Sequence, residues 1–454
     1  MNKTVVINIA GLSKSVICKD TPFLKKYISE NKLALIKPAT PAVTTTMQSC
    51  FVTGKHPNEH GIVGNGWYDR DDCEIKFWKQ SNKLVKADKI WDLAKKNDPS
   101  FTCSKMFWWY NMYSGADYSV TPRPQYHADG GKAPDCYSNP AGLRDDLQKQ
   151  LGTFPLFNFW GPRTSIKSSQ WIADASIIVE KKHDPTLTLI YLPHLDYCLQ
   201  KYGIDFSKIG KDLAEIDKLC KDLILFYESR GAKIILLSEY GICNVKEAIP
   251  INRILRNEGL ISIRKERNYE LLDPGASKAF AIADHQIAHI YLNDPSVKQK
   301  VIDILNNTKG IKQVLDENGK KIHRLNHQRS GDLIAIAEPE NWFTYYYWEK
   351  DEHAPDFAKT VDIHKKPGYD PLEMFMEQKT FTKVKAGYKL LRKKLGFRYL
   401  MDVIPLNPQL IKGSHGSPDI TKEYYPLLIS KDLITNDEVE APDVYSIIWQ
   451  HLFD

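Results

Sequence analysis

Short apolar runs rich in β-branched residues alternate with helical patterns through most of the 454-residue chain. Such alternation is typical of parallel βαβ units. The helical patterns place apolar residues three and four positions apart, as in "IGKDLAEIDKLCKDLILFYESRG", and glycine often ends them. The pattern therefore predicts one wound α/β core, with strands at residues 4–9, 34–38, 187–192, 233–237, 288–292 and 333–337.

Two long stretches interrupt this alternation. Residues 67–162 and 339–400 contain many aromatic and turn residues, as in "FWWYNMY" and "NWFTYYYW". Long irregular stretches in a compact α/β protein usually cover a site. We expect them to be insertions or cap segments within a single domain of residues 1–454. A rigid aromatic packing layer without a binding role is the alternative.

Composition excludes several classes of protein. A hydrophobic fraction of 42% and a charged fraction of 26% are those of a globular chain. No apolar run approaches the roughly 20 residues that span a bilayer, so we expect no transmembrane segment. The start, "MNKTVVINIAGLSKSV", is a strand pattern without a signal-peptide cleavage site, which predicts a cytoplasmic location.

Cysteine spacing and net charge indicate which bonds the cysteines form and which ligands suit the chain. The eight cysteines form no CxxC pair, so isolated buried thiols are expected in place of disulfides or a zinc cluster. A formal net charge of +6 suits a small anionic substrate, but the charges form no stripe for a nucleic-acid polymer. A homo-oligomer remains an open alternative.

The segment "KVKAGYKLLRKKLGFRYL" is a candidate basic amphipathic helix. A role at a membrane surface is one interpretation. The simpler one is a solvated helix face whose leucines pack on the core.

A hydroxyl stands at a corner of the chain in "PAVTTTMQSCFVTGKHPNEHGIVGN", where a strand leads into a helix that begins at the threonines. The N–H groups at a helix N-terminus favour an anion. A threonine there can cap the helix. It can also be a nucleophile toward phosphorus, if its proton is removed and the substrate oxygens are bound.

The order and spacing of "VVINIAGL", this threonine segment, "LTLIYLPHLDYCLQKYG", "AKIILLSEYGI" and "KGSHG" resemble the alkaline phosphatase superfamily. The most similar branch is that of the nucleotide pyrophosphatases/phosphodiesterases, or type I phosphodiesterases. The resemblance implies a three-layer α/β sandwich with a mainly parallel central sheet. It also implies a site with two metal ions, usually zinc, where Thr44 would form a covalent phospho-enzyme.

The resemblance assigns six metal ligands besides the threonine, and this sequence keeps only part of them. Asp196 and His415 match, and Glu239 replaces an aspartate. The other three positions hold Ala10, Gln200 and Tyr240, which are poor zinc ligands. We therefore expect one or two divalent ions, with zinc as the expected metal, held by Asp196, Glu239, His415 and His194. His194 is included because residues two apart at a strand end share a face.

Three further residues are candidates for substrate binding. Gln48 lies beside the position where the family has an asparagine, which is Met47 here. Arg163 in "GPRTSIKSS" and His364 in "DIHKKPGYD" are the others, since arginine and histidine suit phosphate oxygens. His285 and His289 are alternative replacement ligands, although each is more often an ordinary buried histidine.

The sequence therefore supports three hypotheses. The first is a hydrolase of phosphate esters (phosphodiester, pyrophosphate or phosphonate type) with a threonine nucleophile and divalent metal. The second is a catalytically altered or inactive relative that binds an anionic metabolite. The third is an interaction scaffold that uses the aromatic segments. The departures at Ala10, Gln200 and Tyr240 favour the second over a normal two-zinc enzyme.

Overall fold

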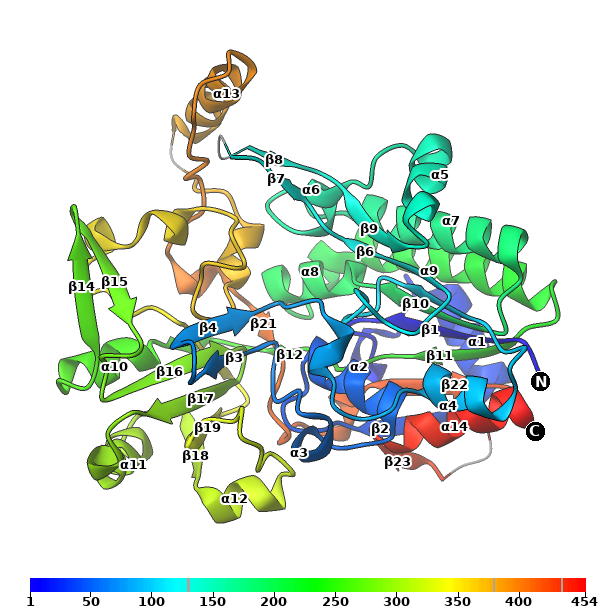
Figure 1. The fold of residues 1–454 in the computed structure, drawn as a ribbon, viewed down its shortest axis with the longest axis horizontal. Helices are drawn as coiled ribbons and strands as arrows, with labels where there is room; N and C mark the ends of the chain where they lie inside the picture. Colours follow the sequence, from blue (N-terminus) through cyan, green and yellow to red (C-terminus); the bar gives the residue numbers. More distant parts are fainter. Residues whose placement is uncertain (129–130, 379, 434–435) are drawn as a thin grey trace.

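The computed structural model describes residues 1–128, 131–378, 380–433 and 436–454 (Figure 1). Its largest element is a nine-stranded sheet, in which most neighbours are parallel and β22 and β9 run antiparallel to theirs. The spatial order is β23 (Glu438–Glu440), β2 (Lys32–Lys37), β22 (Leu427–Ser430), β11 (Lys233–Leu237), β1 (Thr4–Ile9), β10 (Leu187–Leu192), β5 (Cys103–Met106), β6 (Tyr118–Pro122) and β9 (Cys136–Asn139).

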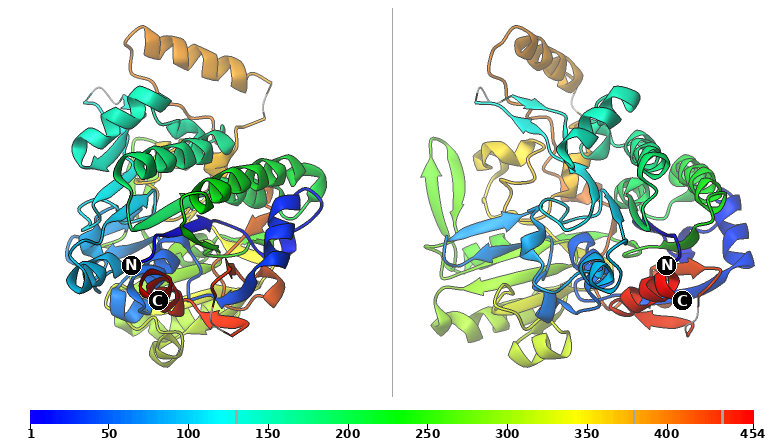
Figure 2. Two further views of the ribbon diagram at one scale, coloured as in Figure 1. Left: turned by 90° about the vertical axis from the view of Figure 1, so that its right-hand side faces the viewer. Right: turned by 45° about the vertical axis from the view of Figure 1, so that its right-hand side comes forward.

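Helices cover both faces of this sheet (Figures 1 and 2). One face carries α7 (Ile166–His183), α8 (His194–Tyr202) and α9 (Phe206–Glu228), and the other carries α2 (Thr44–Thr53) and α14 (Asp443–Phe453). All six residues of β1, "TVVINI", are buried, as expected for a strand covered on both sides. The predicted three-layer α/β fold with a mainly parallel central sheet is confirmed.

A second, four-stranded antiparallel sheet has its own hydrophobic core. Its order is β16 (Ala279–Asp284), β17 (Ile287–Leu292), β19 (Leu333–Ala337) and β18 (Ile311–Leu315), and α10 (Ile251–Asn257), α11 (Lys298–Asn306) and α12 (Glu317–Ile322) accompany it. The assignment of residues 288–292 and 333–337 to the wound core is therefore wrong. Both strands are fully buried, and such apolar runs look alike in parallel and antiparallel sheets.

Part of the irregular stretch 67–162 belongs to the large sheet and does not form a cap. It supplies β5, β6 and β9 to one edge of the large sheet, in addition to the hairpins β3 (Gly66–Asp69) with β4 (Glu74–Phe77) and β7 (Gln125–Tyr126) with β8 (Lys132–Ala133). The stretch 339–400 includes α13 (Thr382–Lys394), which projects from the body (Figure 1).

All eight cysteines are free thiols and six of them are buried, so the prediction of isolated thiols is confirmed. Among the described residues, no helix has both the length and the apolar character that crossing a bilayer needs.

The carboxyl ends of β1 and β11 meet at a close contact between Gly11 and Gly241, which form an isolated β-bridge. A Cβ added at Gly241 would lie 2.0 Å from the Tyr424 carbonyl oxygen. The backbone of Tyr424 passes so close to Gly241 that only glycine fits there.

We therefore expect Gly241→Ala to lower the free energy of unfolding by more than about 2 kcal/mol, because the methyl group overlaps backbone that cannot rotate away. Urea unfolding measures the effect. The control is Gly142→Ala in α5 (Ala141–Leu151), where an added Cβ meets no atom within 4 Å. That variant should be neutral or up to about 1 kcal/mol more stable. Equal stability of both variants would contradict the close contact.

Candidate functional site

Thr44 is the first residue of α2, just after the chain leaves β2. The N-cap position belongs to Val43, whose side chain has no oxygen, so Thr44 does not fill the N-cap role. Thr44 is buried with a relative exposure of 6%, and its Oγ1 lies 3.3 Å from the Tyr240 hydroxyl. The hydroxyl thus faces the carboxyl end of β11, beside a helix N-terminus that favours anions.

The next two threonines bond the start of α2 to the turn at residues 60–65. Thr45 Oγ1 donates to the Gly64 carbonyl at 2.8 Å, and Thr46 Oγ1 donates to the Ile62 carbonyl at 3.1 Å. Asn65 Oδ1 in turn accepts from the Thr45 backbone N–H at 3.3 Å. The threonine run is therefore joined to the "HGIVGN" turn, which explains why the two motifs occur together.

A chain of hydrogen bonds surrounds the Asp196 carboxylate, which lies in the first turn of α8. Tyr240 donates its hydroxyl to Asp196 Oδ1 at 3.1 Å, and Gln200 Nε2 donates to Oδ2 at 2.8 Å. The Tyr369 hydroxyl then donates to Gln200 Oε1 at 2.9 Å. All four side chains are buried, and burial raises the pKa of Asp196 above its usual range.

Glu239 forms a second polar centre next to Thr44. Its Oε2 accepts from Asn8 Nδ2 at 2.7 Å and from Gln48 Nε2 at 2.8 Å. Burial raises the pKa of Glu239 to about 7, although the hydrogen bonds from Gln48 and Asn8 act in the opposite direction. Among the described residues, its buried Oε1 has no hydrogen-bond partner. The Trp109 backbone N–H donates to Gln48 Oε1 at 2.7 Å and fixes the amide.

Two histidines stack on the tyrosines of the site. The His415 and Tyr240 rings are 3.6 Å apart between centroids and inclined by 4°, and the His285 and Tyr369 rings are also 3.6 Å apart. His415 Nδ1 bonds the Ala42 carbonyl at 2.7 Å, which leaves Nε2 facing Asp196 at 3.9 Å. Burial holds the pKa of His415 well below its ordinary value, so this ring is neutral at pH 7.

The donor set does not fit a two-metal centre. Ala10 offers no ligand atom, and Gln200 presents N–H to Asp196. Burial keeps the Tyr240 phenol neutral by raising its pKa well above the ordinary value. Both Asp196 oxygens are already engaged, whereas zinc needs free carboxylate, imidazole or thiolate donors. A single ion held by Asp196, Glu239 and His415 stays a prediction.

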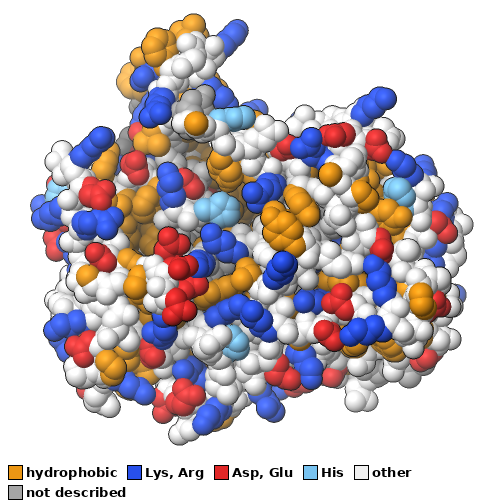
Figure 3. Space-filling view, viewed as in Figure 1, with side chains coloured by type: hydrophobic (Ala, Val, Ile, Leu, Met, Phe, Trp, Pro, Cys, Tyr) orange, Lys and Arg blue, Asp and Glu red, His pale blue; other side chains and the backbone are white. Residues whose placement is uncertain are grey.

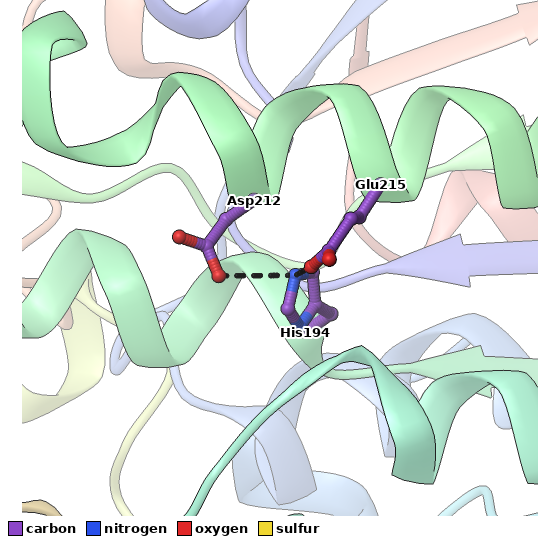
Figure 4. A group of neighbouring side chains, drawn as sticks. All are labelled: His194, Asp212 and Glu215. Carbon is purple, nitrogen blue, oxygen red and sulfur yellow. Dashed lines mark ion pairs between the residues drawn. The ribbon is translucent and has the colours of Figure 1, made fainter.

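His194 faces two carboxylates of α9 (Figure 4). Its Nε2 is 3.2 Å from Asp212 Oδ1 and 3.6 Å from Glu215 Oε2, both on α9. The expectation that His194 and Asp196 share a face assumed a strand end. The chain is already helical here, and helical residues two apart point in different directions. His194, Asp212 and Glu215 are a separate group with donor atoms within 4.8 Å of one another.

Of the three residues predicted to bind substrate, Gln48 bonds to the group around Thr44, and Arg163 and His364 have other partners. Gln48 belongs to the site through Glu239. Arg163 is exposed in a loop, where its carbonyl accepts from Asn158 Nδ2 at 2.8 Å. His364 Nδ1 lies 3.3 Å from the Phe77 carbonyl oxygen. Roles in substrate binding for these residues stay predictions.

Sequence reasoning missed Asn8 and Tyr369 as members of the site. Asn8 is the one amide in the otherwise apolar "VVINI" strand, and that was the available signal. Tyr369 follows the "KKPG" turn and reaches Gln200 from a distant segment. Asp284 was also missed, and its carboxylate accepts from the Asn65 backbone N–H at 2.8 Å and from Nδ2 at 3.0 Å.

Comparison with known proteins places the chain in a family. The model of the type I phosphodiesterase / nucleotide pyrophosphatase family matches residues 4–370. Ectonucleotide pyrophosphatase/phosphodiesterase 2 of Saccharomyces cerevisiae is 22% identical over 377 residues, which is 78% of this chain and 66% of that protein. Ectonucleotide pyrophosphatase/phosphodiesterase 1 of the same yeast is 25% identical, over 59% of this chain and 37% of that protein. This chain thus spans less than two thirds of these relatives.

Solved structures share the fold. Murine ectonucleotide pyrophosphatase/phosphodiesterase 5 superposes with a TM-score of 0.59 at 14% identity, over 99% of this chain and 95% of that one. Phosphonoacetate hydrolase from Sinorhizobium meliloti, in complex with phosphonoformate, superposes with a TM-score of 0.61 at 12% identity, over 99% and 96%.

The raised pKa of Glu239 makes stability depend on pH. Between about pH 4.5 and pH 7 the unfolded chain has lost this proton and the folded chain keeps it, so folding weakens as pH rises. Glu239→Gln removes the effect. The free energy of unfolding of the variant, relative to that of the wild type, should rise by up to about 3 kcal/mol between about pH 4.5 and pH 7. Above about pH 7 this difference should stay constant.

Urea unfolding at a series of pH values measures this difference. Glu266→Gln, in the exposed hairpin of β14 (Ser262–Glu266) and β15 (Tyr269–Asp273), controls for loss of a surface carboxylate. A stability difference between Glu239→Gln and the wild type that is constant across this range would contradict the raised pKa.

Proposed function

This chain belongs to the type I phosphodiesterase / nucleotide pyrophosphatase family, and we propose that it acts on small phosphate esters of phosphodiester, pyrophosphate or phosphonate type. Thr44 is the residue that meets the phosphorus atom. The observation that supports this proposal most directly is the position of the Thr44 hydroxyl at the start of α2, 3.3 Å from the hydroxyl of Tyr240, which directly follows Glu239, a carboxyl whose pKa is about 7.

This arrangement supports attack by the threonine oxygen. A threonine hydroxyl is a weak nucleophile until a nearby base takes its proton. A base works best when its pKa is close to the working pH, and Glu239 meets that condition. As the Thr44 oxygen bonds to phosphorus, its proton passes to the Glu239 carboxylate, and the bond from phosphorus to the leaving oxygen breaks. Glu239 returns the proton to that oxygen. A water molecule then attacks the phosphorus of the phospho-threonine, which releases the phosphoryl product and restores the Thr44 hydroxyl. The N–H groups at the start of α2 favour the phosphoryl oxygens.

The residues around Thr44 argue for a changed metal requirement. Members of the family generally depend on divalent metals, which supply Lewis-acid stabilisation of phosphoryl oxygens when bound. Here Ala10, Gln200 and Tyr240 occupy three of the six ligand positions. We therefore assign the removal of the Thr44 proton to Glu239, because its pKa is close to neutral pH. Tyr240 orients the Thr44 hydroxyl.

The substrate class follows from what relatives bind. An inactive variant of murine ectonucleotide pyrophosphatase/phosphodiesterase 5, in which a threonine is replaced by alanine, has been solved with AMP. The Sinorhizobium meliloti hydrolase has been solved with phosphonoformate and with phosphonoacetate. A small phosphorylated or phosphonate ligand is therefore the first candidate for this chain.

A second function has its own support. The bonds that Tyr240 and Gln200 make to Asp196 leave a closed, fully buried network. Such a network suits a relative that binds an anionic metabolite without turning it over. Binding of AMP or phosphonoacetate with no hydrolysis of any ester would favour this function.

Thr44→Ala should lower kcat for bis-p-nitrophenyl phosphate or p-nitrophenyl phosphate by about 100-fold or more, because no other group replaces the nucleophile. The matched control is Thr53→Ala at the other end of α2, whose hydroxyl bonds the Ser49 carbonyl at 2.6 Å. It should keep activity within about threefold. Equal activity of Thr44→Ala and wild type would refute the nucleophile.

Metal content tests the changed ligand set separately. After incubation with zinc and desalting, we expect fewer than two equivalents of zinc in the wild type, because Ala10 and Gln200 supply no free donor. A variant combining Ala10→Asp, Gln200→His and Tyr240→His restores the missing donor types and should retain more zinc.

Two single variants locate any zinc that remains. Zinc lost in His415→Ala sits at the Thr44 site, whereas zinc lost in Asp212→Asn sits beside His194. Two equivalents in the wild type, both lost in His415→Ala, would overturn this view of the ligand set.

A further inference from the structure

Residues 380–402 form a projecting hairpin, called the arm below, that is built around α13 (Figures 1 and 2). Thr382 is the one residue of this helix that is buried. The arm is inserted in the chain between Tyr369 and His415, two residues of the site. It therefore has both ends fixed in the body and its helix in solvent.

The arm carries an apolar stripe that faces water. Five large apolar residues follow one another at spacings of three and four, which places them on one side of a helix. This corrects the expectation that the leucines of this segment pack on the core. The stripe consists of Phe381 (73% exposed), Val384 (66%), Tyr388 (60%), Leu391 (53%) and Leu395 (64%).

The same arm holds the excess positive charge of the protein. It contains seven lysine and arginine residues and one acid, Asp402. The resulting excess of six equals the formal net charge of the whole chain, so the rest of the sequence is balanced. Among the described residues, Lys385 and Lys389 are the arm's cations with an ion-pair partner, and for both it is Asp402. The other five basic residues are Lys383, Arg392, Lys393, Lys394 and Arg398.

Apolar and basic side chains are gathered together on the projecting part of the surface (Figure 3). A continuous apolar stripe of this kind is unusual on a surface that stays in water. An amphipathic helix with Lys and Arg beside its apolar face is the structure that lies in the interface of a bilayer.

We propose that the arm is a peripheral membrane anchor that binds the surface of a bilayer containing anionic lipids. The stripe enters the boundary between headgroups and acyl chains, and the basic residues meet anionic headgroups. A 13-residue helix is about 20 Å long, too short to cross a hydrocarbon core and suited to lying in its plane.

Charge favours a bilayer over a second copy of the chain. Two arms packed stripe to stripe would bring two clusters of basic residues together, and like charges repel. The remainder of the chain has no net negative charge to attract an arm. An anionic lipid surface complements both the stripe and the cations. The inference uses none of the residues around Thr44 and does not depend on the proposed reaction.

Cosedimentation of the full chain with vesicles tests the proposal. The probes are vesicles of phosphatidylcholine alone and of phosphatidylcholine with 30% phosphatidylserine, taken as about a physiological anionic fraction. We expect binding to the anionic vesicles that weakens at least tenfold between roughly 0.05 and 0.5 M salt, because exposed charges are screened. Equal binding to both kinds of vesicle, or none to either, would overturn the proposal.

Two variants and their controls separate charge from apolar contact. Arg392→Gln, Lys393→Gln and Lys394→Gln together should weaken binding about 100-fold, at roughly fivefold for each charge. The control replaces Lys208, Lys211 and Lys309, which are 57%, 83% and 87% exposed on the body, by Gln and should bind as the wild type does. An equal loss of vesicle binding in both triple variants would mean that binding depends on net charge alone, and it would contradict a role for the arm.

Leu391→Asn with Leu395→Asn should also abolish binding, while the control Ile322→Asn, at a residue that is 78% exposed, should not. Because all these side chains face solvent, the variants should fold, and their unfolding midpoints verify this. Sedimentation velocity gives the opposing outcome. The wild type could be a dimer that becomes a monomer in the double variant Leu391→Asn, Leu395→Asn. If the wild type also fails to bind vesicles, the stripe binds a second copy of the chain and the proposal is wrong.

Discussion

The burial of the Asp196 carboxylate is the constraint on which the candidate site depends. A carboxylate removed from water needs compensating donors or a cation, because an unpaired buried charge costs several kcal/mol. In this chain the Tyr240 hydroxyl and the Gln200 amide supply the donors. Tyr369 then fixes Gln200, and the neutral ring of His415 stacks on Tyr240. The replacements at Tyr240 and Gln200 are thus mutually consistent, since both side chains belong to the one hydrogen-bonded network around Asp196.

Much of the fold could be predicted because it depends on local patterns. The strands β1, β10 and β11 lie where apolar runs indicated them, and α2 begins at the threonine run, where a strand was expected to lead into a helix. The pairing of β17 with β19 could not be predicted, since an apolar run gives no sign of its partner or direction. The framework strands within 67–162 were missed because they are short and lie among turns and aromatic residues.

The candidate site was predicted in its positions and less well in its geometry. Thr44, Asp196 and Glu239 lie near one another because they follow the carboxyl ends of β2, β10 and β11, whereas His415 reaches Asp196 from the separate pair of β12 (Cys243–Asn244) and β21 (Gly413–Ser414). The direction of His194 depended on whether the chain was already helical, and a two-residue spacing reverses its meaning between strand and helix. The contact of Tyr369 with Gln200 joins residues 169 positions apart, which no local pattern can reveal.

The separation of charge between arm and body has a consequence for how the molecule moves. With its excess cations at one projecting end and a balanced remainder, the protein is an electric dipole as well as a net cation. A field from a distant anionic surface would exert a torque that turns this end forward before contact. The orientation of the body, including the direction in which the corner at Thr44 faces, would then be selected during approach.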